Sequence, residues 1–274
     1  MGKTVTARTR TAEFEQIMNA AHEFADLSGD AVLKHFRKRL PVENKAAAGG
    51  FDPVTAADRA AERAIARGIR QRFPDHGIVG EEYGARPGSS PFVWIIDPID
   101  GTRAFIMGSP LWGTLIGVSK REEPYFGLMD HPFLRERLWT GPGASFARAR
   151  GGGVKRLKTR RCSALKDAIL TTTDPDLFEG TQRRKTLSAL KSQVAMTRYG
   201  GDCYCYSLLA AGYVDLVVES GLKPYDVAAV IPIVERAGGR MSTWNGQSAT
   251  RGGDIIAVGD PRLHEAVLRA IARV

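Results

Sequence analysis

The sequence predicts a layered α/β protein, an α+β arrangement in which helices and strands follow one another along a chain of 274 residues. Two observations predict this class. Helical periodicity and strand-like apolar runs occur in turn along nearly the whole chain. Hydrophobic residues make up 43% and charged residues 25% of the composition, which allows a large core and excludes a disordered, collagen-like or disulfide-scaffold protein. Length alone leaves open one large domain or two fused lobes.

Two amphipathic helices are predicted first. One spans residues 11–39, where apolar side chains recur at helical spacing and acidic residues precede basic ones. The other begins after Thr55, because a threonine followed three residues later by Asp58 is typical of a helix N-cap. Its apolar face runs from Ala61 to Phe73, and Pro74 ends it.

Strands are predicted between Ile78 and Phe133. Four apolar runs carry this prediction, each bounded by glycine, proline or charged residues: GIVG, FVWII, LWGTLIGVS and EPYFGLMD. The later part of the chain alternates again, with strands over 168–173 and 213–219, helices over 182–192 and 202–211, a helix from Asp226 to Ala237 and a terminal helix from Asp260. Mixed elements of this kind indicate layered packing.

No fixed-period repeat, low-complexity tract or long linker divides the chain. The basic, glycine-rich turn near residues 145–160 therefore marks at most a boundary between two lobes of one integrated domain. The N-terminal lobe, 1–145, contains most of the acidic residues discussed below. The C-terminal lobe, 146–274, contains Asp226 and the residues that we expect to select the substrate.

Membrane and secretory functions are not expected. The longest apolar stretch, from Val227 to Val234, has eight residues, whereas a membrane span needs about 20. The first ten residues lack the apolar core of a secretory signal. Three cysteines, at 162, 203 and 205, are an odd and sparse set, which favours a reducing compartment. We therefore predict a cytoplasmic protein with no membrane partner.

A basic excess raises the question of an anionic partner. The chain has 39 Lys+Arg against 30 Asp+Glu, a formal net charge of +9, and residues 148–161 concentrate part of it. Such a cluster could attract phosphates or nucleic acid. The cluster surrounds three consecutive glycines, 151–153, which is also typical of a solvated turn between strands. We favour the turn and do not expect a nucleic-acid partner.

The segment 92–102, FVWIIDPIDGT, is the most informative part of the sequence. An apolar strand places Asp97 at its end, Pro98 interrupts the strand, and Asp100 follows across a tight bend, so two carboxylates converge. Together with the carbonyl of Ile99 they form an oxygen donor set that suits a hard cation such as Mg²⁺. Asp-Pro and Asp-Gly pairs are also common turn formers, so the residues alone leave a plain loop open.

Four further acids have similar alternatives. Glu81 and Glu82 directly follow the GIVG strand and could supply a metal ligand and its neighbour, or could form a solvated acidic loop. Asp58 and Asp226 stand at predicted helix starts, where a capping role explains an acid equally well.

Phosphate binding is predicted beside these acids, at Gly101 and Thr102, whose amides could hold phosphate oxygens if a helix starts there. The chain has no Gly-x-Ser-x-Gly elbow, no Walker loop and no histidine pair at zinc spacing. Its histidines are scattered, and we interpret all of them as structural or solvated: His22, His35, His76, His131 and His264.

Four motifs occur in a fixed order: VTAAD (54–58), GEE (80–82), WIIDPIDGT (94–102) and YDVAA (225–229). Together they resemble the inositol monophosphatase superfamily of Mg²⁺-dependent, Li⁺-sensitive phosphatases, and the DPIDGT element is specific to it. The resemblance covers most of the chain and favours the metal-site interpretation over turns and caps. It implies an α/β/α/β/α sandwich and a homodimer.

The resemblance also implies a role for each matching residue. Two or three Mg²⁺ ions would be held by the oxygens of Glu81, Asp97, Ile99, Asp100 and Asp226. The catalytic group would be Asp58 and Thr102, which orient the attacking water, together with Glu81. Gly101 and Thr102 would bind the phosphate, and Glu82 would support the ligands from behind. The implied reaction is hydrolysis of a small phosphate monoester by metal-activated water, without a nucleophilic side chain.

Two segments bear on the substrate. Inositol-specific members usually follow DGT with an Asn-Phe pair, whereas this chain has Arg103-Ala104-Phe105. The stretch DGTRAFIMGSPLWGTLIG and residues 200–239 are similar to the histidinol-phosphate phosphatase branch. Asp202 and Glu219 would then complement the ammonium and imidazole groups of L-histidinol phosphate. From the residues alone, Asp202 could instead cap a short helix and Glu219 could end a strand at the surface.

We therefore expect a phosphomonoesterase that hydrolyses L-histidinol phosphate to L-histidinol and phosphate, as a cytoplasmic enzyme of histidine biosynthesis. The alternative within the same class is an inositol-1-phosphate phosphatase. The alternative from another class is a basic regulatory protein that associates with RNA or the transcription machinery, which the charge of +9 and the cluster at 148–161 motivate.

Overall fold

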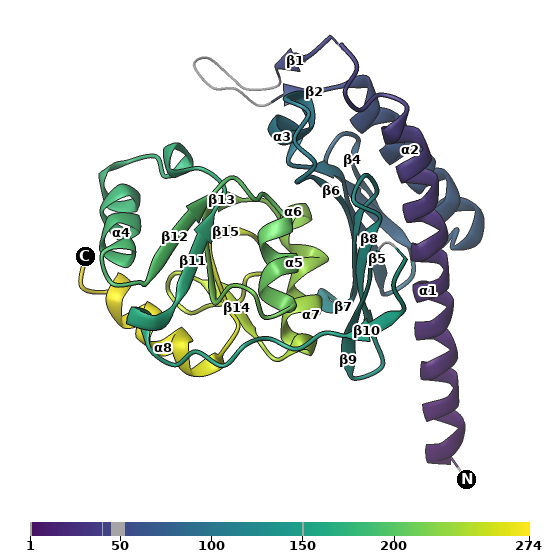
Figure 1. Cartoon of the computed structure of the whole chain (residues 1–274). Helices are drawn as coiled ribbons and strands as arrows, with labels where there is room; N and C mark the ends of the chain where they lie inside the picture. The colour runs from purple at the N-terminus through teal and green to yellow at the C-terminus, as the bar shows by residue number, and fades with distance from the viewer. Residues whose placement is uncertain (1, 40, 45–52, 150) are drawn as a thin grey trace.

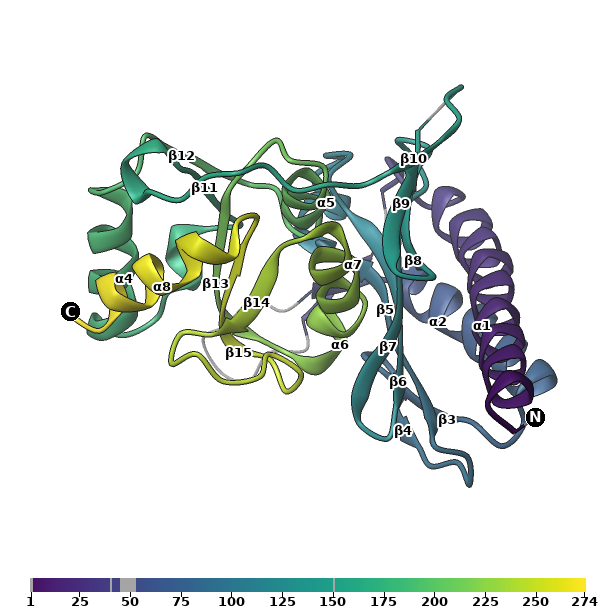
Figure 2. The same ribbon diagram turned by 90° about the horizontal axis from the view of Figure 1, so that it is seen from below.

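The computed structural model describes residues 2–39, 41–44, 53–149 and 151–274. Its helices and sheets form five alternating layers, seen from the side in Figure 1 and from below in Figure 2. Two long helices cover an eight-stranded sheet, three short helices fill the space between this sheet and a five-stranded sheet, and two further helices cover the far side. This is the α/β/α/β/α sandwich that the resemblance implied, so the predicted fold class is confirmed.

The first layer consists of α1 (Gly2–Leu33) and α2 (Ala56–Arg72). The predicted cap of the second helix is confirmed. Thr55 Oγ1 accepts a hydrogen bond from Ala57 N at 3.1 Å, and Asp58 Oδ2 accepts one from Thr55 N at 2.8 Å. Together these bonds satisfy backbone N–H groups that the first turn of a helix leaves unpaired.

The first helix was predicted over 11–39, but it begins earlier and ends at Leu33. The chain leaves the helix because Phe36 packs into an aromatic cluster, with its ring centroid 5.2 Å from that of Trp112 and 4.8 Å from that of Phe133. Arg37 then takes a left-handed backbone conformation with φ of 60°, which no continuing α-helix allows.

An eight-stranded sheet forms the second layer. Its strands are β3 (Gly77–Gly80), β4 (Gly84–Arg86), β5 (Phe92–Asp100), β6 (Gly113–Lys120), β7 (Glu123–His131), β8 (Glu136–Gly141), β9 (Ala144–Arg148) and β10 (Val154–Arg156). They lie in the order β10-β9-β8-β7-β6-β5-β3-β4. The four predicted runs correspond to β3, β5, β6 and β7. The sequence analysis missed the other four, which are short or rich in charged residues.

Strand β5 does not end at Asp97 as predicted but continues to Asp100. Its register with β6 shifts between these two residues, because Pro98 has no N–H to offer the ladder. Thr114 on β6 holds this bulge in place, since its Oγ1 donates to the Pro98 carbonyl at 2.8 Å. The same hydroxyl lies 3.0 Å from Ser28 Oγ, which connects the bulge to α1.

The third layer contains α5 (Tyr204–Ala210), α6 (Pro224–Ala228) and α7 (Val230–Ala237). The single helix predicted from Asp226 to Ala237 is therefore two helices. Glycines on the sheet let them approach closely: a Cβ on Gly127 would lie 2.0 Å from the Ala229 carbonyl oxygen, and one on Gly117 would lie 2.7 Å from Ala228 Cβ. This close packing brings the start of α6 to the end of β5.

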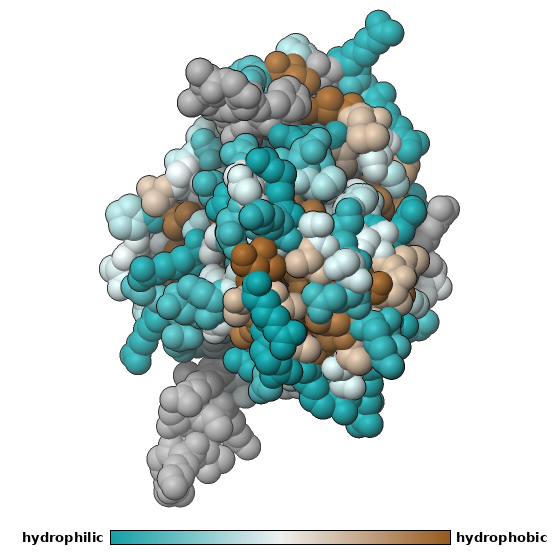
Figure 3. All heavy atoms as spheres, turned by 90° about the vertical axis from the view of Figure 1, so that its left-hand side faces the viewer, coloured by the Kyte–Doolittle hydropathy of each residue, from teal (hydrophilic) through white to brown (hydrophobic). Residues whose placement is uncertain are grey.

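The last two layers are a five-stranded sheet and its covering helices α4 (Thr181–Lys191) and α8 (Pro261–Ile271). The strands are β11 (Ile169–Thr172), β12 (Met196–Tyr199), β13 (Leu216–Leu222), β14 (Arg240–Thr243) and β15 (Gly253–Val258), in the order β12-β11-β13-β15-β14. The predicted start of the last helix is confirmed, because Asp260 Oδ1 accepts from Arg262 N. The outward face of this layer is largely hydrophilic (Figure 3).

Five short elements complete the fold: β1 (Glu43–Asn44), β2 (Pro53–Val54), α3 (Thr102–Ile106) and two 3₁₀ turns, η1 (Leu165–Asp167) and η2 (Pro175–Leu177). Because β9 and β10 still belong to the first sheet, the chain changes sheets between Arg156 and Ile169. The predicted boundary at 145/146 falls inside β9, and we propose instead that the two lobes meet within 157–168. No helix in the described part of the chain has the length and apolar character to span a bilayer.

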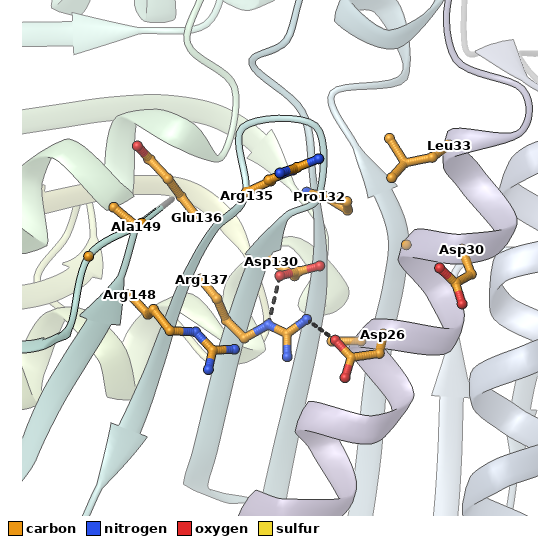
Figure 4. A pocket seen from close by; sticks show the side chains of 14 residues that line it. Asp26, Asp30, Leu33, Asp130, Pro132, Arg135, Glu136, Arg137, Arg148 and Ala149 are labelled. Carbon is orange, nitrogen blue, oxygen red and sulfur yellow. Dashed lines mark hydrogen bonds and ion pairs between the residues drawn. The ribbon is translucent and has the colours of Figure 1, made fainter.

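Arg137 connects α1 to the eight-stranded sheet and lines a cavity of about 480 Å³ (Figure 4). Its Nε donates to Asp130 Oδ1 and its Nη2 donates to Asp26 Oδ1, both at 2.7 Å. The arginine is 8% exposed and Asp130 is 5% exposed, so each charge depends on the other for compensation. The bond from Arg137 to Asp26 joins α1 to the sheet.

Candidate active site

A second cavity, of about 330 Å³, forms where β5, α3, α5, α6 and β13 meet. Most of the predicted site residues line it, although they come from distant parts of the sequence: Glu81, Asp97, Ile99, Asp100, Gly101, Thr102, Asp202, Glu219 and Asp226. Asp58 and Glu82 are predicted site residues that lie outside this lining.

Three aspartates form the centre of the site. One carboxylate oxygen each from Asp97, Asp100 and Asp226 lies within 4.8 Å of the other two. Every one of these side chains also accepts a hydrogen bond from a backbone N–H, which fixes its direction: Ile99 N to Asp97 Oδ1 at 3.0 Å, Cys203 N to Asp100 Oδ1 at 2.9 Å and Lys223 N to Asp226 Oδ2 at 2.6 Å. Asp226 is the third residue of α6, and Lys223 is the residue that precedes this helix.

The aspartates repel one another strongly. Burial raises the pKa of Asp97 well above its usual range, and the charges of Glu81, Asp100 and Asp226 raise it further. Burial is also the largest cause for Asp100, whose pKa is raised well above the usual range, with the charges of Asp226 and Asp202 next. The arrangement therefore calls for a compensating positive charge.

A hard divalent cation fits these donors. Carboxylate oxygens are the ligands that Mg²⁺ prefers, and ligands of one octahedral Mg²⁺ stand about 3 to 4 Å apart, so three oxygens that lie within 4.8 Å of one another are near enough to share one ion. The acids present could thus hold such an ion with little rearrangement. Glu81 adds a fourth carboxylate, because it lines the same cavity and forms a side-chain hydrogen bond with Asp97.

Asp58 and Thr102, the predicted water-orienting pair, have other partners here. Thr55 donates to Asp58 Oδ2, whereas Thr102 Oγ1 donates to the Ile99 carbonyl at 3.1 Å. Asp58 Oδ1 is buried and accepts no hydrogen bond from any residue that the structure describes. It therefore remains available as an acceptor, and the pairing stays a prediction. Asp58 also lies near Glu82, whose charge contributes to raising the Asp58 pKa, after burial as the main cause.

The condition for phosphate binding at Gly101 and Thr102 was that a helix starts there, and α3 does begin at Thr102, whereas phosphate binding itself stays a prediction. Gly101 precedes it with a φ of 87°, a left-handed conformation that favours glycine. A Cβ there would also approach the Asp202 side chain to 3.1 Å. Glycine is thus required both by the turn and by the close approach of Asp202.

Neither predicted substrate residue has the alternative role left open by the sequence, which was a helix cap for Asp202 and a strand end at the surface for Glu219. Glu219 is 2% exposed, inside β13, and accepts hydrogen bonds from Thr173 N at 2.8 Å and Thr172 Oγ1 at 3.2 Å, so it does not end a strand at the surface. Burial raises its pKa to about 8. Asp202 does not cap α5, because Cys203 occupies that position. Burial raises the Asp202 pKa to about 6, although nearby Arg103 lowers it.

Glu62 is the main site-related residue that the sequence analysis missed. Its carboxylate lies behind the Glu81-Glu82 loop, and its spacing of four residues from Asp58, on the buried face of α2, could have revealed it. No histidine is among the described residues that line the cavity. His131, for example, lies between the Trp112 carbonyl and Ser207 Oγ, away from the cavity.

The chain matches the model of the inositol monophosphatase family over residues 13–274. It is 39% identical over 270 residues to "Bifunctional phosphatase IMPL2, chloroplastic" of Arabidopsis thaliana, covering 94% of this chain and 76% of that protein. It is 33% identical over 255 residues to a histidinol-phosphatase of Chlorobaculum parvum, covering 93% and 96%. A solved inositol monophosphatase from Zymomonas mobilis has a TM-score of 0.80 and 38% identity, covering 94% and 98%.

Replacing one central acid tests the cation site. Asp100→Asn keeps an oxygen acceptor for Cys203 N but removes a negative charge. Without added metal, the variant should melt at a higher temperature than the wild type, because repulsion is smaller. Mg²⁺ at 100 times its dissociation constant should stabilise the wild type by about 2.7 kcal/mol and leave the variant unchanged. Thermal unfolding with Mg²⁺ or a chelator measures both effects.

The matched control is Asp75→Asn, which removes the same charge from an exposed position at the end of α2. It should respond to Mg²⁺ like the wild type. An equal Mg²⁺ response from Asp100→Asn and the wild type would contradict the assignment of this cluster.

Proposed function

We propose that the substrate of this protein is L-histidinol phosphate and that its cofactor is Mg²⁺. The premise is that the chain belongs to the inositol monophosphatase family and is a phosphatase. The family supports the reaction class, which is hydrolysis of a phosphate monoester. The donor set of Asp97, Asp100, Asp226 and Glu81 supports the choice of Mg²⁺, with two or three ions per site. The proposed enzyme would act in histidine biosynthesis, in the cytoplasm as predicted.

One observation carries the choice of substrate. Glu219 and Asp202 line the same cavity as the three aspartates, so two additional acids face the space in which a leaving group would lie. The leaving group of L-histidinol phosphate carries an ammonium and an imidazole, and both can donate hydrogen bonds to carboxylates. The relative from Chlorobaculum parvum, named a histidinol-phosphatase, is consistent with this choice.

In the proposed mechanism, water attacks the phosphorus and no side chain becomes phosphorylated. Bound Mg²⁺ would neutralise phosphate charge and increase the acidity of the attacking water. Asp58 and Thr102 would orient this water: Thr102 lines the cavity, and Asp58 Oδ1, which has no hydrogen-bond partner among the described residues, is available to accept a hydrogen bond. Amides at Gly101 and Thr102 orient the phosphate. Cys203 also lines the cavity, but burial raises its pKa well above the usual range, so it stays a neutral thiol.

Inositol 1-phosphate is the second candidate substrate. The solved inositol monophosphatase from Zymomonas mobilis, 38% identical over 94% of this chain, favours it. Its leaving group is a neutral polyol, which gains less from two carboxylates than a cationic group does. We do not propose the RNA-associated alternative, which is motivated by the net charge of +9 and the basic cluster at 148–161.

We also propose that the protein forms a homodimer. Four hydrophobic side chains near the end of α3 are unusually exposed: Val42 at 39%, Ile106 at 39%, Met107 at 78% and Phe133 at 40%. Arg37 links them, because its guanidinium lies 4.6 Å from the centre of the Phe133 ring and its Nε donates to the Gly108 carbonyl. Exposed apolar groups of this kind are typical of an interface.

The substrate proposal is tested by phosphate release from a panel of esters. We expect kcat/KM for L-histidinol phosphate to exceed that for inositol 1-phosphate by at least about tenfold, since one charge-assisted hydrogen bond to the leaving group contributes about 1.5–3 kcal/mol. Fructose bisphosphate and a nucleotide monophosphate complete the panel. A higher kcat/KM for inositol 1-phosphate would reverse the proposal.

Asp202→Asn tests whether this acid contacts the leaving group. Loss of its charge should lower kcat/KM for L-histidinol phosphate by about 10- to 100-fold, because a charge-assisted hydrogen bond is weakened. Hydrolysis of 4-nitrophenyl phosphate, whose leaving group has no ammonium, serves as the internal control and should change little. Equal losses with both esters would contradict a specific contact.

Sedimentation velocity at micromolar concentration tests the dimer. The wild type should sediment with twice the chain mass. Met107→Lys should sediment as a monomer, because it places a charge within the exposed apolar cluster. Val154→Lys, at an exposed position on β10, is the control and should remain dimeric. A monomeric wild type would exclude the proposal.

A further inference from the structure

Glu62 is a buried carboxylate for which the proposed reaction has no role. It lies in α2, one turn after Asp58, and is 2% exposed. One of its oxygens, Oε2, accepts from Glu82 N at 2.8 Å, and the other, Oε1, accepts from Tyr83 N at 3.1 Å. Two successive backbone N–H groups of the loop after β3 therefore point at a single side chain from another element.

The loop is shaped around this carboxylate. A Cβ on Gly80 would lie 1.8 Å from Glu62 Oε1 and 2.4 Å from its carboxyl carbon, so a side chain at position 80 would displace the Glu62 carboxylate from its two N–H donors. Gly80 does not have a positive φ, so its conformation does not explain the glycine. What requires glycine here is the space that Glu62 occupies.

These contacts hold Glu81 from both sides. Its own N–H donates to the Ile96 carbonyl at 3.2 Å, in the residue that directly precedes Asp97 on β5. The next N–H along the chain, that of Glu82, donates to Glu62. Since the peptide planes before and after Glu81 are both fixed, its Cα–Cβ direction is fixed as well. That direction brings the Glu81 carboxylate to Asp97.

We propose that Glu62 is a positioning residue for the cation site, which orients Glu81 toward Asp97 by holding the Glu81–Glu82 peptide. This inference rests on the proposed metal site. Glu62 itself does not line the cavity and acts through the loop. Partners that orient metal ligands from behind commonly change metal affinity by about 10- to 100-fold when they are replaced.

A purely structural role makes a different prediction. If Glu62 only joins α2 to β3, its replacement lowers the stability of the metal-free protein and leaves the metal affinity of the folded protein unchanged. If it positions Glu81, the folded variant binds metal more weakly. Metal affinity therefore separates the two roles, and thermal stability does not.

The decisive variant is Glu62→Gln, which has the same shape. Its amide oxygen can accept one of the two N–H groups, but its NH₂ group faces the other and cannot accept it. Direct Mn²⁺ binding, measured by electron paramagnetic resonance, should be weakened about 10- to 100-fold. Hydrogen exchange should quicken at the amides of Glu82 and Tyr83. In assays, the half-saturating Mg²⁺ concentration should rise by a similar factor, whereas kcat at saturating Mg²⁺ should stay near the wild-type value.

Glu23→Gln is the matched control. Glu23 on α1 pairs with Arg72 at the other end of α2, so this variant also removes a carboxylate that contacts α2, far from the loop. It should bind Mn²⁺ like the wild type. If Glu62→Gln does not fold, Glu62→Asp replaces it, because the shorter side chain keeps the charge but withdraws the acceptor from the loop.

The outcomes separate this inference from the function on which it rests. A wild type that binds no Mn²⁺, or a Glu81→Gln variant that binds it as tightly as the wild type, contradicts the proposed metal site itself. A wild type that binds Mn²⁺, with a folded Glu62 variant of equal affinity, contradicts the positioning role alone.

Discussion

Repulsion between buried carboxylates is the constraint that organises this molecule. Burial raises the pKa values of Asp97 and Asp100, and the charges of neighbouring carboxylates raise them further, so the fold must hold in place groups that would otherwise separate. It does so with backbone N–H groups, one for each aspartate, and with a bulge in β5 that Thr114 keeps in register. Holding the aspartates together lowers the stability of the fold when no cation is present, and the same arrangement gives the site its affinity for a cation.

Much of this could be predicted from sequence. Helical and strand periodicity predicted the layered fold, and Thr55 with Asp58 predicted the start of α2 correctly. The acids in the four motifs were expected at one site, and the structure places Asp97, Asp100, Asp226 and Glu81 around one cavity. Local signals sufficed here because a cap and an apolar strand end are determined by neighbours in the chain.

Most of the remainder depended on contacts that sequence spacing does not encode. Glycines of β6 and β7 allow α6 and α7 to pack closely. The break between those helices has a local signal that the prediction missed, because Pro232 has no N–H to donate to the Ala228 carbonyl at the end of α6. Apart from its spacing along α2, the sequence gives no sign that Glu62 is more than a surface acid, whereas in the structure two N–H groups of the loop after β3 donate to it. Glu219 resembled a strand end at the surface, but β13 continues past it to Leu222 and the Glu219 side chain is buried. For both acids a partner more than ten residues away decides the environment.

The change of sheet between Arg156 and Ile169 has a consequence for assembly of the site. Asp97 and Asp100 come from the part of the chain before this change, whereas Asp226 comes from the part after it, and Cys203 N, which orients Asp100, also comes from the later part. Neither half contains all three aspartates. The acidic cluster therefore forms only when both halves have folded and docked in the correct orientation.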